Sequence, residues 1–187
     1  MRLRRRIATT SLLVFLLALL CPGPAAAQRK GEYLTKDEMD LVQDIRKIEN
    51  RTEVFLKVAD RRLIALQGVE YKDPRFGNQF GPLPTGSQTE LLDDYRQAVE
   101  ELEIKLDDEF ERTGMSDGVV KALTFADTEM DRQIKALEAL RPKLTEGDAT
   151  HYADRAVAAA KEFHDGVKKA LEQVPAEKRE AAKKKKG

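Results

Sequence analysis

Apolar residues recur at steps of three and four along most of the chain, which is the spacing of one face of an α-helix. This pattern predicts helices at residues 36–67, 88–112, 117–141 and 149–174. No segment alternates apolar and polar residues in the way that a half-exposed β-strand does. We therefore expect an all-α fold in which four amphipathic helices pack as a four-helix bundle.

The first predicted helix is the longest, and local signals mark both of its ends. Thr35 and Glu38 have the spacing of a capping box, and Gly68 can end the helix in a left-handed conformation. Its stripe consists of Ile45, Ile48, Thr52, Phe55, Ala59, Arg62 and Leu66. A helix over 36–67 would be about 48 Å long. This length suits a coiled-coil arm, so a homodimer through this helix stays open.

The other helix ends carry similar signals. Ser87 and Glu90 form a second capping box, Ser116 precedes the third helix, and Pro142 should end or kink that helix. The links before and after the third helix are short, which favours antiparallel neighbours. The first link is long enough that an up-down-up-down order and an order with one crossover both remain open.

The first link, residues 69–86, is rich in Gly and Pro and carries Tyr71, Phe76 and Phe80. Long connections in compact domains are usually packed or functional, so we interpret these aromatic residues as a candidate interaction loop. Four apolar residues lie off their helix stripes and form a candidate second apolar surface: Val54, Ile64, Ile104 and Phe125. We expect the loop to fold over the Val54 and Ile64 side of the first helix.

Residues 1–27 have the pattern of a secretory signal peptide. Arginines precede an apolar run over 12–20, and small residues end at Ala27. The run is shorter than the roughly 20 residues that span a bilayer. We expect cleavage near Ala27 and a periplasmic or secreted protein, with lipid anchoring at Cys21 as the alternative. The mature chain would then hold no cysteine, which excludes thiolate chemistry.

The net charge of zero hides an uneven distribution. Residues 28–175 carry a net charge of −8, whereas residues 176–187 carry +4. An acidic body argues against nucleic-acid binding, because phosphate neutralisation dominates that affinity. We expect the tail to be disordered and to make at most weak contact with an anionic membrane surface. Its basic run is Lys183, Lys184, Lys185 and Lys186.

The two histidines, His151 and His164, are the main candidates for metal or haem chemistry. Met39 and His164 are placed like the axial ligands of a bundle cytochrome, but Met39 points away from the stripe of its helix. A di-metal site needs paired Glu-x-x-His motifs, and the chain has Asp148 and Lys161 at the required positions. Phosphate-loop and hydrolase motifs are missing from the sequence. We expect no cofactor, no metal and no enzymatic activity.

These patterns favour an exported, non-enzymatic interaction or scaffold protein of the cell envelope, with an unknown partner. A chaperone-like or envelope-adaptor role is one alternative, and a haem- or metal-binding bundle using His164 is another. The residues Leu34 to Glu38 resemble the Leu-Thr-x-x-Gln motif of small helical periplasmic chaperones, with Glu38 in place of Gln. The capping box accounts for the same residues.

Overall fold

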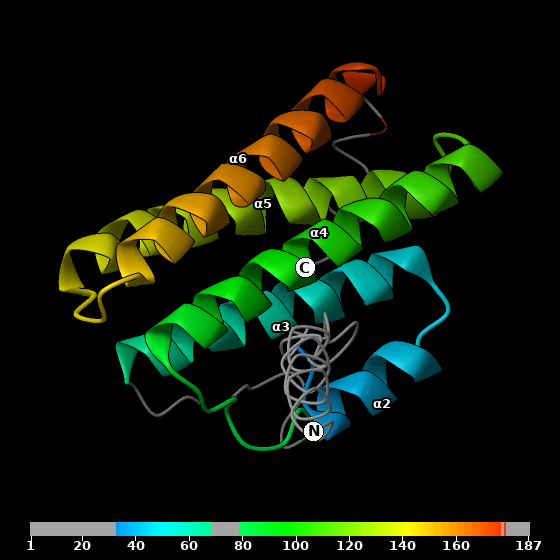
Figure 1. Cartoon of the computed structure of the whole chain (residues 1–187). Coiled ribbons are helices and arrows are strands. Elements are labelled where there is room, and N and C mark those ends of the chain that lie inside the picture. Colours follow the sequence, from blue (N-terminus) through cyan, green and yellow to red (C-terminus); the bar gives the residue numbers. More distant parts are fainter. Residues whose placement is uncertain (1–32, 69–78, 177, 179–187) are drawn as a thin grey trace, which may run out of the picture. The chain divides into compact units, whose positions relative to one another are not determined.

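The computed structural model describes residues 33–68, 79–176 and 178, and this part of the chain is all-helical, with no strand (Figure 1). Its elements are α2 (Lys36–Asp44), α3 (Ile48–Gln67), α4 (Gln88–Thr113), α5 (Asp117–Leu140), the short 3-10 helix η1 (Arg141–Lys143) and α6 (Ala149–Glu172). None of these helices is long and apolar enough to cross a membrane. Residues 79–86 of the predicted link form no helix.

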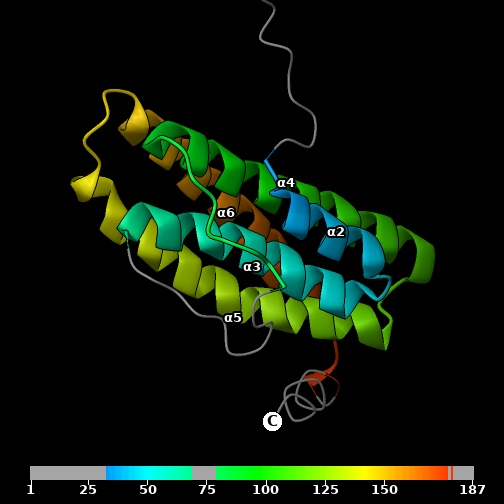
Figure 2. The same ribbon diagram turned by 90° about the horizontal axis from the view of Figure 1, so that it is seen from below.

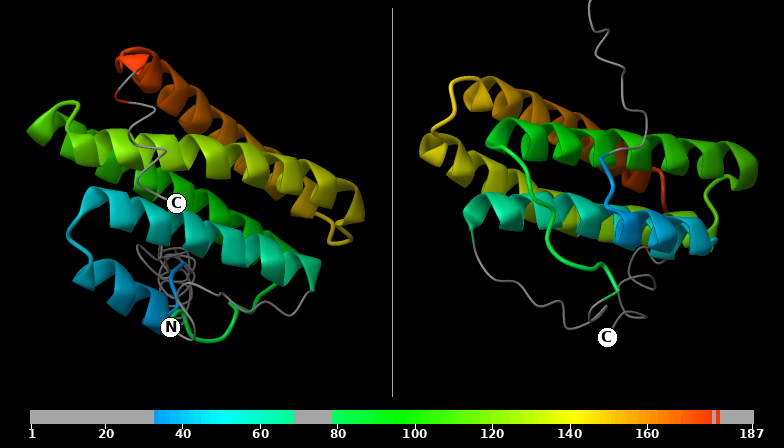
Figure 3. Two further views of the ribbon diagram at one scale, coloured as in Figure 1. Left: turned by 180° about the vertical axis from the view of Figure 1, so that it is seen from behind. Right: turned by 60° about the horizontal axis from the view of Figure 1, so that its bottom comes forward.

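The predicted unbroken helix over 36–67 is wrong, because the chain leaves helical geometry between α2 and α3. Ile45 and Lys47 have extended backbones, with ψ of 118° and 130°. This break lets α2 turn back beside α3 (Figures 1 and 3). Arg51 stabilises the break, since its Nε and Nη2 donate to the backbone oxygen of Ile45 at 3.1 and 2.6 Å.

Both predicted capping boxes are formed. Thr35 Oγ1 accepts from the backbone nitrogen of Glu38 at 3.3 Å, and Glu38 Oε2 accepts from that of Thr35 at 2.9 Å. Ser87 and Glu90 repeat this arrangement at the start of α4. Gly68 ends α3 with a φ of 66°, a conformation that favours glycine. Local signals therefore set most helix ends as predicted.

Helices α3 to α6 share one hydrophobic core, and each packs mainly against two of the others. α3 and α6 both pack against α4 and α5, whereas α4 and α5 barely contact each other (Figure 2). The expectation that α4 and α5 are neighbours is therefore wrong. Their short link constrains only the helix ends. Fully extended from Thr113 to Asp117, the link can span about 14 Å. Helices packed about 10 Å from their direct neighbours lie about 14 Å from the diagonal helix, so the link is long enough to join α4 to a diagonal α5.

Side-chain contacts give the helix directions. A Cβ at Gly118 would lie 3.4 Å from Cγ2 of Ile48, near the starts of α5 and α3. Farther along both helices, Gln133 Nε2 donates to the backbone oxygen of Leu56 at 2.9 Å. Contacts therefore advance together along α3 and α5, which run parallel to each other.

The starts of α4 and α6 also lie together, held by a reciprocal clamp. Glu146, just before α6, accepts from the backbone nitrogens of Gln88 and Thr89 at 2.9 and 3.2 Å. The side-chain oxygen of Gln88 accepts from the backbone nitrogens of Thr145 and Glu146 at 2.9 and 3.1 Å. Glu146 thereby satisfies two amide groups that the start of α4 leaves unpaired.

Candidate functional site

The most unusual feature of the described residues is a buried ionic cluster between α2 and α3. Glu38 and Arg62 are both 0% exposed, and Arg61 is also buried. Glu38 Oε1 accepts from Arg61 Nε at 2.9 Å and from Arg62 Nη1 at 2.6 Å, and Glu38 Oε2 accepts from Arg62 Nη2 at 2.7 Å. Arg62 thus holds the carboxylate through two parallel hydrogen bonds, a strong geometry for such a pair.

Arg61 extends this cluster to the segment that precedes α4. Its Nη2 donates to the backbone oxygens of Phe80 and Gly81 at 3.1 and 3.3 Å, and also to that of Pro82. The guanidinium carbon lies 5.3 Å from the centre of the Phe80 ring. Gly81 has a φ of 65°, and an added Cβ there would collide with Asp37 on α2. Arg61 therefore joins α2, α3 and this segment.

Arg62 extends the cluster toward the start of α2. Its Nη2 also donates to the backbone oxygen of Tyr33, and its Nη1 donates to that of Val58 at 2.9 Å. Its Nε has no hydrogen-bond partner in the described part of the chain, although it is buried. The cluster is therefore tightly bonded on the side of Glu38 and incompletely paired at Nε.

Two carboxyl groups near Arg62 are shifted in opposite directions. Burial raises the pKa of Glu38, but its hydrogen bond with Arg62 and the charge of Arg62 outweigh this, so the pKa falls below its ordinary value. Burial raises the pKa of Asp94 on α4 to about 6, against the opposing charge of Arg62. Asp93 and Glu90 add to this rise. Glu38 is therefore the paired anion of the cluster.

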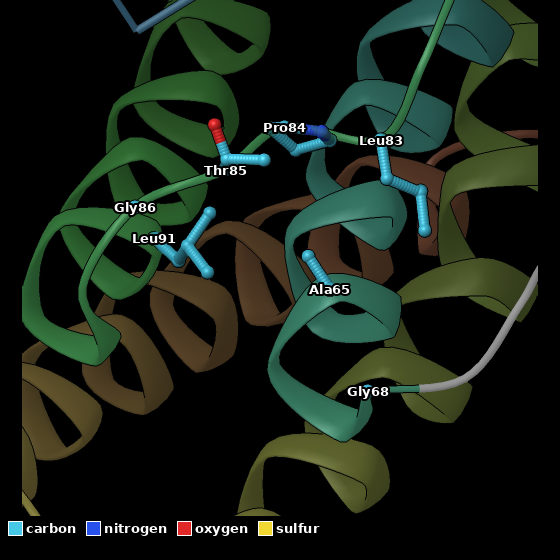
Figure 4. A pocket seen from close by; sticks show the side chains of 7 residues that line it. All are labelled: Ala65, Gly68, Leu83, Pro84, Thr85, Gly86 and Leu91. Atoms are coloured by element: carbon cyan, nitrogen blue, oxygen red, sulfur yellow. The ribbon is translucent and has the colours of Figure 1, made fainter.

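An apolar pocket lies at the end of α3 (Figure 4). It is lined by Ala65, Gly68, Leu83, Pro84, Thr85, Gly86 and Leu91. The side chains of Ala65 and Leu91 approach it from α3 and α4, and the extended segment 83–86 closes one side (Figure 4). Its walls therefore come from the residues just before the predicted link and from the end of that link.

The predicted loop aromatics fall in two classes. Phe80 is buried in the core against α3. Tyr71 and Phe76 lie outside the described residues, as do the lysines Lys183 to Lys186. The structure therefore places one of the three aromatic residues, and that residue has a packing role.

The four residues of the predicted second apolar surface do not form one surface. Val54 and Ile64 are buried in the described structure, because α3 is enclosed by α4 and α5 together with α2 and the Phe80 segment. Phe125 is half-buried and packs against the core. Ile104 alone among the four is exposed, at 51%. The off-stripe positions of Val54 and Ile64 reflect burial of α3 on several sides, whereas Ile104 is an exposed apolar residue.

Neither histidine lies in a metal-binding group. His164 is buried, and its Nε2 lies 3.0 Å from Asp127 Oδ1 across the α5–α6 interface. His151 is exposed, with its ring edge against Tyr152. Met39 is exposed on α2. The described residues contain no group of three or more His, Cys, Asp or Glu side chains that could hold a metal ion.

Comparison with known proteins identified no relative of this chain. No protein-family model matches the chain, and neither a curated protein nor a solved structure matches it. The fold and the cluster define the class of the molecule, an all-α protein with one helix attached through buried charge.

Proposed function

We propose that this chain is an exported, non-enzymatic interaction or scaffold protein of the cell envelope. In this proposal, α3 to α6 form a four-helix bundle and α2 lies on its outside. The shared core of these four helices supports the bundle, and the signal-peptide pattern of residues 1–27 supports export. The partner is a protein that inserts an aliphatic side chain into the pocket at the end of α3.

The shape and chemistry of this pocket are the observation that carries the proposal. Its walls are mainly apolar, and Pro82 and Pro84 restrict the backbone of the segment that closes it. Arg61 also holds Pro82 through its backbone oxygen. A surface that is ordered before binding loses less conformational entropy when a partner docks. Thr85 is exposed beside the pocket.

Capture of partners from envelope extract tests this proposal. Ala65→Leu should fill the pocket without disturbing α3, because leucine is a good helix former, and it should abolish capture of a specific partner. The matched control is Ala158→Leu on the exposed face of α6, which should leave capture unchanged. Equal capture by the wild type and both variants would contradict the pocket as the binding site.

A chaperone-like role is the second candidate, and the exposed apolar residues of α4 favour it. Ile104 and Phe110 are among the most exposed large apolar side chains of the described residues. α4 also carries ten acidic and three basic residues, which would keep a bound client soluble. Replacing both apolar residues by serine should then abolish protection of a denatured client from aggregation. Unchanged protection would remove this alternative.

A further inference from the structure

We propose that α2 exchanges between two copies of this chain, so that the protein forms a domain-swapped homodimer. In the exchanged form, Glu38 of each copy binds Arg61 and Arg62 of the other copy. Residues 45–47 become helical, and α2 and α3 join into one helix over 36–67. This inference concerns assembly and goes beyond the proposed partner binding.

The first observation is that local sequence does not encode the break between α2 and α3. Ile45, Arg46 and Lys47 include no Gly or Pro, and arginine and lysine are good helix formers. Lys47 makes no side-chain capping hydrogen bond to α3, and α2 ends without a left-handed residue. Helical periodicity also continues through these residues. Tertiary contacts therefore impose the break.

The second observation is that the contacts holding α2 do not depend on the hinge. The cluster joins Glu38 to Arg61 and Arg62, and Arg62 also holds the backbone oxygen of Tyr33. All of these groups lie outside residues 45–47. A second copy can therefore supply the same contacts, and the swapped dimer keeps them while it gains the helical hydrogen bonds of the hinge. Short hinges of this kind favour swapping.

The third observation explains why an α2 that leaves its own bundle would bind to a second copy and not stay free in solution. Glu38 is the only residue of α2 that is fully buried, and its departure would break both of its hydrogen bonds with Arg62, which is 0% exposed while α2 is docked. An unpaired buried charge is strongly unfavourable. Undocked α2 is therefore scarce, and a second copy restores the ion pair. Because each copy donates one α2 and receives one, the assembly closes with two-fold symmetry.

Hinge variants of the full-length chain, measured by size-exclusion chromatography with light scattering, test this proposal. Lys47→Pro fits the observed φ of −79° but cannot lie inside a continuous helix, so it should abolish the dimer. The matched control, Lys47→Ala, is compatible with both forms and should dimerise at least as much as the wild type. Arg51→Ala removes the side chain that binds the Ile45 oxygen and should increase the dimer fraction.

The wild type should show a dimer fraction that increases with protein concentration after slow equilibration. Hydrogen exchange of its separated fractions provides a readout that does not need Lys47→Pro to fold. The amides of 45–47 should be protected in the dimer and exposed in the monomer. The proposal would be overturned if the wild type, Lys47→Ala and Arg51→Ala all stayed monomeric. A dimer that persists in Lys47→Pro or exposes these hinge amides would also overturn it.

Discussion

The attachments of α2 and α6 show two different ways to hold an amphipathic helix. α2 has nine residues, and Glu38 is the one that is fully buried. α6 has 24 residues and buries seven apolar side chains together with His164. α2 is therefore held mainly through one ionic cluster, whereas the attachment of α6 is spread over many apolar contacts.

Helix length explains why α2 depends on this cluster. Isolated helices shorter than about 12 residues are marginal in water even with good helix formers. Of the apolar residues of α2, Leu41 and Val42 are only partly buried and Met39 is exposed, so they contribute little. On α6, Ala149, Ala153, Ala156 and Ala160 are buried, and their small side chains allow close helix packing. The attachment of α2 should therefore be sensitive to changes of side-chain charge, and the attachment of α6 to changes of side-chain volume.

The largest expected effect comes from Arg62→Ala. The variant leaves Glu38 buried without its main partner, and breaking such a pair costs about 3–5 kcal/mol. Urea unfolding measures the loss. Replacing both residues, with Glu38→Met and Arg62→Leu, should recover only part of it, because Arg61 then stays buried without the carboxylate that it binds in the wild type. A single variant as stable as the wild type would show that charge does not hold α2.

Overpacking the α6 interface should have the next largest effect. Ala156 is 0% exposed, and Ala156→Leu should cost about 1–3 kcal/mol because the added atoms force neighbouring side chains apart. Ala158→Leu, on the exposed face of the same helix, should change the free energy of unfolding by less than about 0.5 kcal/mol. Equal effects of the two leucines would contradict close packing at this interface.

Asp94→Asn tests the second carboxyl near Arg62. Because the pKa of Asp94 is raised from 3.8 to about 6, the folded state binds this proton more tightly than the unfolded state does. Stability therefore falls as pH rises from about 4 to 6 and stays lower above that range. At neutral pH, Asn should stabilise the fold by about 1 kcal/mol, a value discounted for solvent screening.

Urea unfolding across this pH range measures the effect of Asp94→Asn. The exposed Asp108→Asn on the same helix is the control. The pH dependence that Glu38 contributes to stability has the opposite sign to that of Asp94. Its lowered pKa makes its contribution present above its ordinary value of 4.5 and lost as pH falls below it. If Asp94→Asn stabilised the fold equally at every pH, the pH-dependent loss of stability could not come from titration of the Asp94 carboxyl.

The smallest expected effect is at an exposed ion pair between α5 and α6. Lys161 Nζ lies 2.7 Å from Glu138 Oε1, and both side chains are about half exposed. Lys161→Ala should therefore cost less than about 0.5 kcal/mol in urea unfolding. A loss as large as that of Arg62→Ala would remove the distinction between buried and exposed ion pairs in this protein.

Local signals were enough to predict the all-α class and most of the helix ends. Both capping boxes formed, and Gly68 and Gly114 end their helices with φ of 66° and 62°. These features depend on residues a few positions apart, so the sequence pattern contains them. The break at 45–47 depends on contacts between Glu38 and arginines more than 20 positions away, and helical periodicity does not detect such contacts.

One signal for the buried cluster was present in the sequence. Arg62 falls on the predicted apolar stripe, at a position that faces the core, and a charged side chain there needs a buried partner. Many acidic residues could have been that partner, so the pattern alone did not select Glu38. The pocket was also beyond prediction, because it depends on how residues 83–86 pack beside α3.

Hydrogen exchange of the backbone amides in the wild type and Glu38→Gln tests the attachment of α2 most directly. We predict that wild-type α2 opens at a lower free energy than α6, because one cluster holds it. Glu38→Gln should speed exchange in α2 and leave α6 unchanged. Wild-type α2 amides as protected as those of α6, or equal loss of protection in both helices of the variant, would contradict this account.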